Sequence, residues 1–153
     1  MPTTILKSSE HALPQNREAC ICSALRGLAR RTTAIYDHSL APTGLKQTQY
    51  AVLARLDRLV HCSLAELAKA SDLDVTSLSR ALRPLVNARL VNAGQGKDDR
   101  TKRYELTARG KRVLRKAYQL WLKAQTRVHG VITADHVRTI QNLSEMLLPL
   151  KPR

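Results

Sequence analysis

The chain has 153 residues, enough for one domain with its own hydrophobic core. It carries 26 Lys and Arg residues against 12 Asp and Glu residues, a formal net charge of +14, which favours an anionic partner: nucleic acid first, an anionic membrane second. With no Phe, one Trp and four Tyr, it has few rings on which to stack single-stranded bases, which argues against modules that bind RNA loops or single strands.

The cysteines and histidines indicate neither a disulfide scaffold nor a metal site. Cys20, Cys22 and Cys62 are few and odd in number, which suits a reducing compartment, and the dispersed histidines lack metal-ligand spacing. No signal core or bilayer-length apolar run is present, so we expect a cytoplasmic protein with no membrane partner. No glycine-rich phosphate loop, nucleophile elbow or paired His/Glu motif is found, so we expect no enzyme and no cofactor.

Apolar residues at three- and four-residue steps predict a long helix over 17–40. "APTG" at 41–44 breaks it, and a second helix is predicted over 45–60. Ser63 and Glu66 form a capping box that opens a short helix ending near Ala70.

Asp74 is the expected N-cap of the next helix, over 75–88. Two short helices joined by about four residues predict a helix-turn-helix. Pro84 should bend or locally weaken the second one.

Two short strands are predicted over 90–94 and 101–106, joined by a charged, glycine-containing loop into an antiparallel hairpin. Thr107 can cap a helix to about Gly130, and Thr133 can cap the last one. The predicted fold class is therefore mainly α with a small antiparallel β-hairpin: a winged helix-turn-helix.

The polar face of helix 75–88 is the first candidate DNA-binding surface. On a helical wheel Leu78, Leu82 and Leu85 face the core. The predicted contacts form a polar stripe on the opposite side, with Ser77 at its flank: Thr76, Ser77, Arg80, Arg83 and Asn87. A helix fits the major groove of B-DNA, where Arg can bond bidentately to guanine. The alternative is an ordinary solvated face.

The hairpin is the second candidate surface, through Lys97, Asp98, Arg100, Lys102 and Arg103. Arg100 is the predicted minor-groove residue, held by Asp98, because negative potential in that groove attracts Arg. The three other cations would contact phosphates, which adds affinity without sequence choice. The alternative is an exposed, solvated hairpin tip.

In these parts the sequence resembles the MarR family of bacterial transcriptional regulators. The resemblance rests on "LAELAKASDLDVTSLSRALRPLVNARLV", "KDDRTKRYELTARGKRVL" and "LAPTGLKQTQYAVLARL", and it covers roughly residues 17–148. It implies a homodimer in which 17–40 and 108–150 are dimerisation helices and 45–106 is the DNA-binding lobe. It also implies a pseudo-palindromic operator and release by a small phenolic or lipophilic effector.

Two positions depart from the family pattern. Arg89 occupies a turn where the family generally has Gly, so a left-handed residue there would be strained by roughly 1 kcal/mol, or the turn differs. Val75 stands where relatives often have a polar or basic residue, so one DNA contact would be missing.

Cys22 and Tyr36, fourteen residues apart on the first helix, resemble the sensor pair of the peroxide-sensing OhrR branch, with Arg26 in place of a second tyrosine. The alternative is an inert core cysteine. Cys20 and Cys22 lie about 200° apart on a helix and cannot join without unwinding it.

We therefore expect a sequence-specific, homodimeric DNA-binding regulator, a repressor released by a small ligand or by thiol oxidation. A non-specific architectural or RNA-associated basic protein is the alternative that net charge alone would equally support. A membrane-surface protein ranks last, because the basic helix after the hairpin needs its apolar side for packing.

Overall fold

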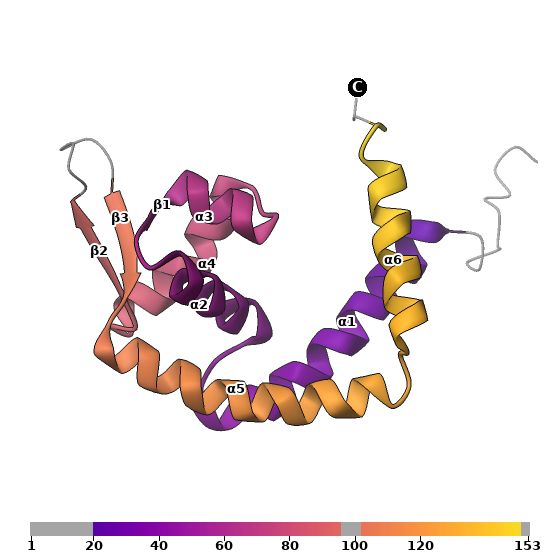
Figure 1. The fold of residues 1–153 in the computed structure, drawn as a ribbon, viewed down its shortest axis with the longest axis horizontal. Coiled ribbons are helices and arrows are strands. Elements are labelled where there is room, and N and C mark those ends of the chain that lie inside the picture. The colour runs from indigo at the N-terminus through magenta and orange to yellow at the C-terminus, as the bar shows by residue number, and fades with distance from the viewer. Residues whose placement is uncertain (1–19, 96–101, 151–153) are drawn as a thin grey trace, which may run out of the picture.

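A computed structural model describes residues 20–95 and 102–150. The elements, in chain order, are α1 (Ile21–Leu40), the 3₁₀ turn η2 (Ala41–Thr43), α2 (Gln47–Leu59), β1 (Cys62–Ser63), α3 (Leu64–Ser71), α4 (Val75–Asn87), β2 (Val91–Gln95), β3 (Lys102–Leu106), α5 (Ala108–His129) and α6 (Ala134–Leu147). Helix-turn-helix and hairpin follow one another directly (Figure 1), which confirms the predicted winged helix-turn-helix.

The sheet has one strand more than the predicted hairpin. Its order is β1-β3-β2, with both pairs antiparallel. In the hairpin Val91 lies opposite Leu106 and Gln95 opposite Lys102, whereas β1 contributes two residues, with Cys62 opposite Tyr104. A two-residue strand has no readable alternation, so the sequence pattern could not reveal it.

Side-chain caps begin four of the helices, as their sequences predict. The backbone N–H of Glu66 donates to Ser63 Oγ at 3.2 Å, and Ser63 N–H donates to the Glu66 carboxylate at 2.7 Å. Asp74 accepts from the backbone N–H and the hydroxyl of Ser77, and these hydrogen bonds lower the pKa of its carboxyl. Thr107 and Thr133 cap α5 and α6 in the same way.

Pro84 does not end α4, which continues to Asn87. The turn that follows it contains the expected left-handed residue: Arg89 has a φ of 56°. An L residue with a side chain is disfavoured in this region, so the turn is strained.

The start of α5 is hydrogen-bonded to this turn. Thr107 Oγ1 donates to the carbonyl oxygen of Arg89 at 2.9 Å, and Thr107 N–H donates to that of Leu90 at 3.1 Å. Gly110 lies so close that a Cβ there would be 2.0 Å from Leu90 O. The third residue of α5 must therefore be glycine for α4, the β2–β3 hairpin (the wing) and α5 to meet as they do.

One hydrophobic core joins the lobe to the first half of α5. Leu53 and Leu56 of α2, Leu67 of α3 and Leu78 of α4 are fully buried in it. Ala117 of α5 is buried in the same core. The core therefore fixes α4 relative to both the wing and the long helix.

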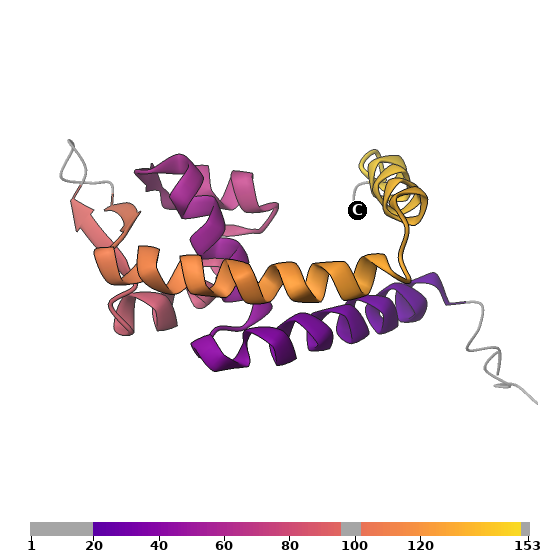
Figure 2. The same cartoon turned by 60° about the horizontal axis from the view of Figure 1, so that its bottom comes forward.

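The rest of the chain forms an arm that leaves the lobe. α1 and α5 run antiparallel and side by side, with the start of α1 near the end of α5 (Figure 2). α6 turns away from α5 and stands apart from the lobe (Figure 1), and none of its residues is buried. The arm therefore carries helix faces that this chain alone does not cover.

Candidate nucleic-acid interface and effector pocket

The polar face of α4 projects from the lobe as its sequence predicts. Leu78, Leu82 and Leu85 are at most 3% exposed, so the helix is anchored through its apolar side. The predicted contact residues are all exposed: Thr76, Ser77, Arg80, Arg83 and Asn87. Val75 at the helix start is exposed too, at 49%.

A groove of about 230 Å³ runs between α4 and the wing. Ser79, Arg83 and Asn87 line it from the helix, and Lys102 and Tyr104 line it from β3. Leu82, Val86 and Ala93 form the apolar part of its lining. The structure thus brings part of the predicted helix surface and the base of the wing to one surface. Tyr104 belongs to this surface although its sequence position, within a strand, gave no sign of it.

The wing residues divide into three cases. Lys97, Asp98 and Arg100 lie outside the described residues. Lys102 is exposed. Arg103 forms an ion pair with Glu66 at 2.8 Å, which ties the wing to the cap of α3.

Hydrogen bonds from Ser63, together with the Arg103 charge, lower the pKa of the Glu66 carboxyl. Glu66 therefore stays ionised beside the predicted phosphate contact. The pairing with Arg103 was not visible in sequence, because 37 residues separate the two side chains.

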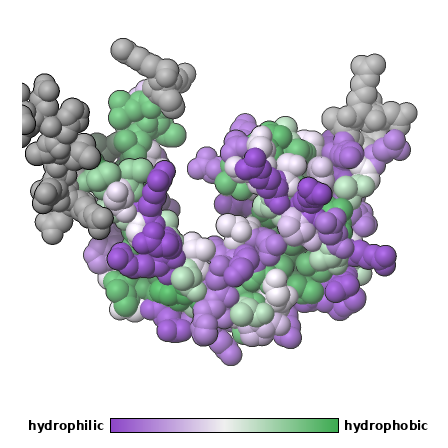
Figure 3. Space-filling model, turned by 180° about the vertical axis from the view of Figure 1, so that it is seen from behind, coloured by the Kyte–Doolittle hydropathy of each residue, from purple (hydrophilic) through white to green (hydrophobic). Residues whose placement is uncertain are grey.

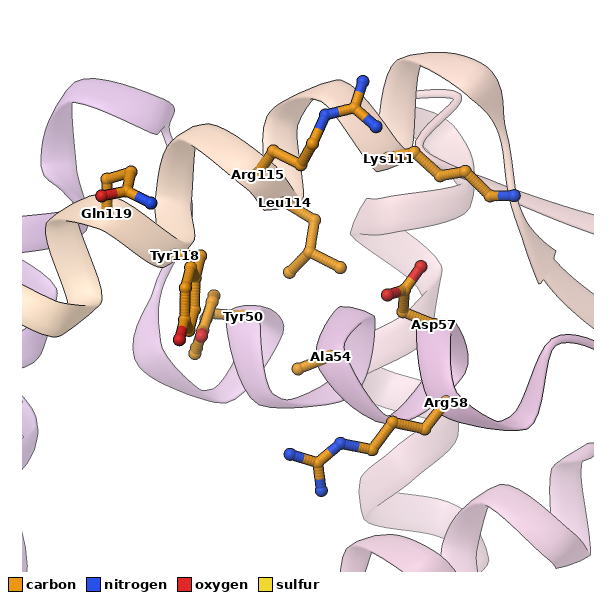
Figure 4. Close-up of a pocket in the computed structure, with 9 residues that line it drawn as sticks. All are labelled: Tyr50, Ala54, Asp57, Arg58, Lys111, Leu114, Arg115, Tyr118 and Gln119. Atoms are coloured by element: carbon orange, nitrogen blue, oxygen red, sulfur yellow. The ribbon is translucent and has the colours of Figure 1, made fainter.

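The second feature is a pocket of about 560 Å³ between α2 and α5, within the range of small-molecule sites. Tyr50 and Tyr118 lie side by side at one end, Asp57 stands at the other, and Leu114 and Ala54 lie between them (Figure 4). The remaining lining residues are Arg58, Lys111, Arg115 and Gln119. An apolar floor with charged groups around it suits a small ring bearing a polar substituent.

Exposed apolar side chains gather on the arm. Figure 3 shows them at the far end of α6, across an open gap from the lobe. On and just after α6 they are Ile140, Leu143, Met146, Leu147, Leu148 and Leu150, and on α1 they include Ile21, Leu25, Leu28 and Ile35. Contiguous exposed apolar surface of this kind is characteristic of a protein–protein interface.

Known proteins share this architecture. Residues 45–110 match a family model described as a winged helix DNA-binding domain. The transcriptional regulator MosR from M. tuberculosis, solved in complex with DNA, is 33% identical, with 87% of this chain and 99% of that one covered and a TM-score of 0.79. The chain belongs to the MarR family.

More distant MarR-family structures share the fold. A MarR variant from E. coli in complex with operator DNA is 23% identical, with coverage of 82% of this chain and 91% of that one and a TM-score of 0.72. BpsR from Bordetella bronchiseptica, whose DNA binding is regulated by 6-hydroxynicotinic acid, is 20% identical, with coverage of 88% and 98% and a TM-score of 0.73. The resemblance to MarR regulators is confirmed.

In this MarR-family chain Cys22 and Tyr36 do not meet within one protomer. Cys22 is exposed near the start of α1, and Tyr36, buried fourteen residues later, is about 21 Å further along the same helix. The Tyr36 hydroxyl donates a hydrogen bond to the side-chain oxygen of Gln125 in α5, and burial raises the pKa of Tyr36. A contact between the two would therefore have to form across a dimer.

Cys20 is a second exposed thiol, two residues before Cys22. It is exposed at the N-cap of α1, and hydrogen bonds from Ser23 lower the pKa of its thiol. Cys62 is buried, and that burial raises its thiol pKa. Of these two, Cys20 has the larger thiolate fraction and hence the greater reactivity.

Trp121 links the pocket to α1. Its ring stacks on Tyr50 and Tyr118, both in the pocket wall, at centroid distances of 5.8 and 6.1 Å, and on Tyr36 at 6.3 Å. It is the chain's one tryptophan. A ligand against the two pocket tyrosines would therefore alter the surroundings of a single fluorophore.

Within residues 20–95 and 102–150 no three His, Cys, Asp or Glu side chains are grouped to hold a metal ion. Over the same residues, no helix combines the length and hydropathy needed to cross a membrane.

Proposed function

We propose that this chain is a homodimeric, sequence-specific regulator that binds duplex DNA and represses genes next to its operator. One observation carries the proposal: the exposed polar face of α4 continues across a groove onto the wing. The DNA complexes of MosR and of E. coli MarR support it. The family of regulators further supports a cytoplasmic protein without enzymatic activity.

In this proposal α4 is the recognition helix, whose residues enter a major groove. Arg80 and Arg83 read base edges, since Arg bonds bidentately to guanine. Thr76 and Ser77 lie in the first turn, where backbone amides favour phosphate, and Asn87 lies at the end of the same face. Lys102 and Arg103 add phosphate contacts from the wing, with Lys97, Asp98 and Arg100 at its tip.

The exposed apolar side chains of the arm support a homodimer. A second copy of the chain can cover the apolar faces of α1 and α6, which a single copy leaves exposed. Two lobes related by a two-fold axis then read half-sites about one helical turn apart, so a pseudo-palindromic operator is expected.

The experiment is a selection of bound duplexes from a random library at physiological salt. We expect enrichment of an inverted repeat whose half-site centres are about 10 base pairs apart. Recovery of duplexes without any common motif would contradict sequence-specific binding. It would instead support the architectural alternative, in which affinity depends steeply on salt but not on sequence.

We further infer that a small aromatic effector enters the pocket between α2 and α5 and releases the DNA. The pocket's size and its tyrosine wall support this, as does the regulation of BpsR by a small aromatic acid. A ligand screen can follow Trp121 fluorescence, and Tyr118→Ala should weaken the response of a true ligand. If Tyr118→Ala leaves the fluorescence response to a ligand unchanged, that ligand binds elsewhere.

Thiol oxidation is the second candidate signal, favoured by the exposure of Cys20 and Cys22 on the arm. Cys22→Ser should abolish hydroperoxide-induced release if Cys22, with Tyr36 of the other protomer, is the sensor. Cys20→Ser is the matched variant, two residues away on the chain. Release that survives both substitutions would contradict a sensor at this end of α1.

A further inference from the structure

α5 has an unusual charge distribution for a helix of its length. Between Ala108 and His129 it carries seven Lys and Arg residues and no Asp or Glu. All seven are exposed, and none of the ion pairs among the described residues includes an α5 side chain. Like charges four residues apart, such as Arg112 with Lys116 and Lys123 with Arg127, destabilise a helix, so this arrangement opposes folding.

The seven cations fall into two groups on the helix surface. Lys111 and Arg115 line the pocket. The other five form what we call the α5 stripe: Arg109, Arg112, Lys116, Lys123 and Arg127. At about 100° per residue the stripe occupies a sector roughly 60° wide, and at about 1.5 Å per residue it is ~27 Å long.

Arg109 lines a hollow together with Val86 and Ala93, at the edge of the surface that we assign to the operator. The rest of the α5 stripe is separate from that surface. α5 packs on the core through Leu114 and Ala117, on another side of the helix from the stripe. α4 packs on the same core through Leu78 and Leu85, with its polar face directed outward. The two surfaces therefore point away from the core in different directions, with α5 along one edge of the molecule (Figure 1).

We propose that the α5 stripe binds the phosphate backbone of a second duplex DNA segment, so that one dimer joins two duplexes. Duplex DNA carries about one negative charge per 1.7 Å of its axis, so a row of cations of this length lies in a strongly negative potential along the duplex. Phosphate contacts carry no sequence information, so the second duplex can have any sequence.

Charge complementarity favours a duplex over a lipid surface. A helix that lies on a membrane needs a broad apolar face for the acyl chains. The apolar residues nearest the stripe, Val113 and Leu120, are packed against the core, which leaves the stripe without such a face.

The test measures bridging and single-duplex affinity side by side. A 40-base-pair duplex on beads, the full-length protein and a free, labelled duplex of unrelated sequence are mixed at about 100 mM salt, and the captured label is measured. The variant is Arg112→Gln/Lys116→Gln/Lys123→Gln. The matched control, Lys46→Gln/Arg55→Gln/Arg138→Gln, removes the same charge away from α5.

We expect wild type and control to capture the labelled duplex, and the stripe variant to capture at least tenfold less. The affinity of the stripe variant for a single duplex, measured by anisotropy, should change less than threefold. This pattern does not depend on operator choice, so it separates this inference from sequence-specific binding.

Three results would overturn it. Unchanged capture by the stripe variant would mean that the two lobes hold the two duplexes. An equal loss of single-duplex affinity would place the stripe on the operator surface. Loss of binding to vesicles of 30% phosphatidylserine in the stripe variant, with no capture of DNA by wild type, would assign the stripe to a lipid surface.

Discussion

The side chains of α4 that point away from the lobe are the single residues on which sequence-specific DNA binding depends. Arg80 and Arg83 are exposed on a helix whose opposite side is anchored in the core, so their removal should not disturb the fold. Arg80→Ala or Arg83→Ala should weaken operator binding by about 1–3 kcal/mol and relax base choice at one position.

Repeating the library selection with each variant checks this. A loss of the same size on every sequence would instead identify the side chain as a phosphate contact.

Arg89 provides a test of backbone strain. Its φ of 56° is disfavoured for any residue with a Cβ, whereas glycine adopts it freely. Arg89→Gly should raise the free energy of unfolding by about 1 kcal/mol, measured by urea denaturation at fixed protein concentration.

Arg89→Ala is the matched control, because it removes the same side chain and keeps the strain. A gain in stability from the alanine variant as large as that from glycine would show that the side chain, and not the backbone, is the cause.

At the scale of elements, the junction between the recognition helix, the wing and α5 determines how the DNA-binding surface is held. Gly110→Ala would place a Cβ against the carbonyl oxygen of Leu90, a backbone atom that cannot move freely. Overpacking should cost about 3 kcal/mol, and the better helix propensity of Ala returns only about 1 kcal/mol.

We therefore expect a net loss of about 2 kcal/mol in the free energy of unfolding. Gly94→Ala is the control, since a Cβ there meets nothing within 4 Å. Equal stabilities of the two variants would contradict a close junction.

The sequence allowed the helices to be predicted because their signals are local. Ser63, Asp74, Thr107 and Thr133 each cap the helix that follows them, and the spacing of Leu78, Leu82 and Leu85 identifies the buried side of α4. Such signals depend on residues three or four positions apart.

Features built from distant residues could not be predicted in this way. β1 exists because two residues meet β3, and the Arg103–Glu66 pair joins positions 37 apart. The pocket likewise depends on how Tyr50 of α2 and Tyr118 of α5 come together. Only the folded chain brings the residues of this strand, this ion pair and this pocket together.

The arm determines whether the whole molecule binds DNA with one recognition helix or with two, because it carries the proposed dimer interface. Leu143 is half-exposed on α6, and a second copy would bury it. Leu143→Asp should therefore raise the dissociation constant of the dimer about 100-fold or more, because an unpaired charge in an interface costs several kcal/mol.

Sedimentation velocity over a range of concentrations checks this. Gln141→Asp is the control, since residue 141 lies about 200° around the helix from residue 143. A Leu143→Asp protein that remains as dimeric as wild type would contradict an interface through α6.

We propose that this MarR-family chain, as a dimer, selects one DNA sequence through α4. The most direct test is an anisotropy titration against the duplex upstream of the protein's own gene and against a shuffled duplex, at physiological salt. We expect a preference of about 10³ or more for the upstream duplex. Equal, steeply salt-dependent binding to both duplexes would contradict it.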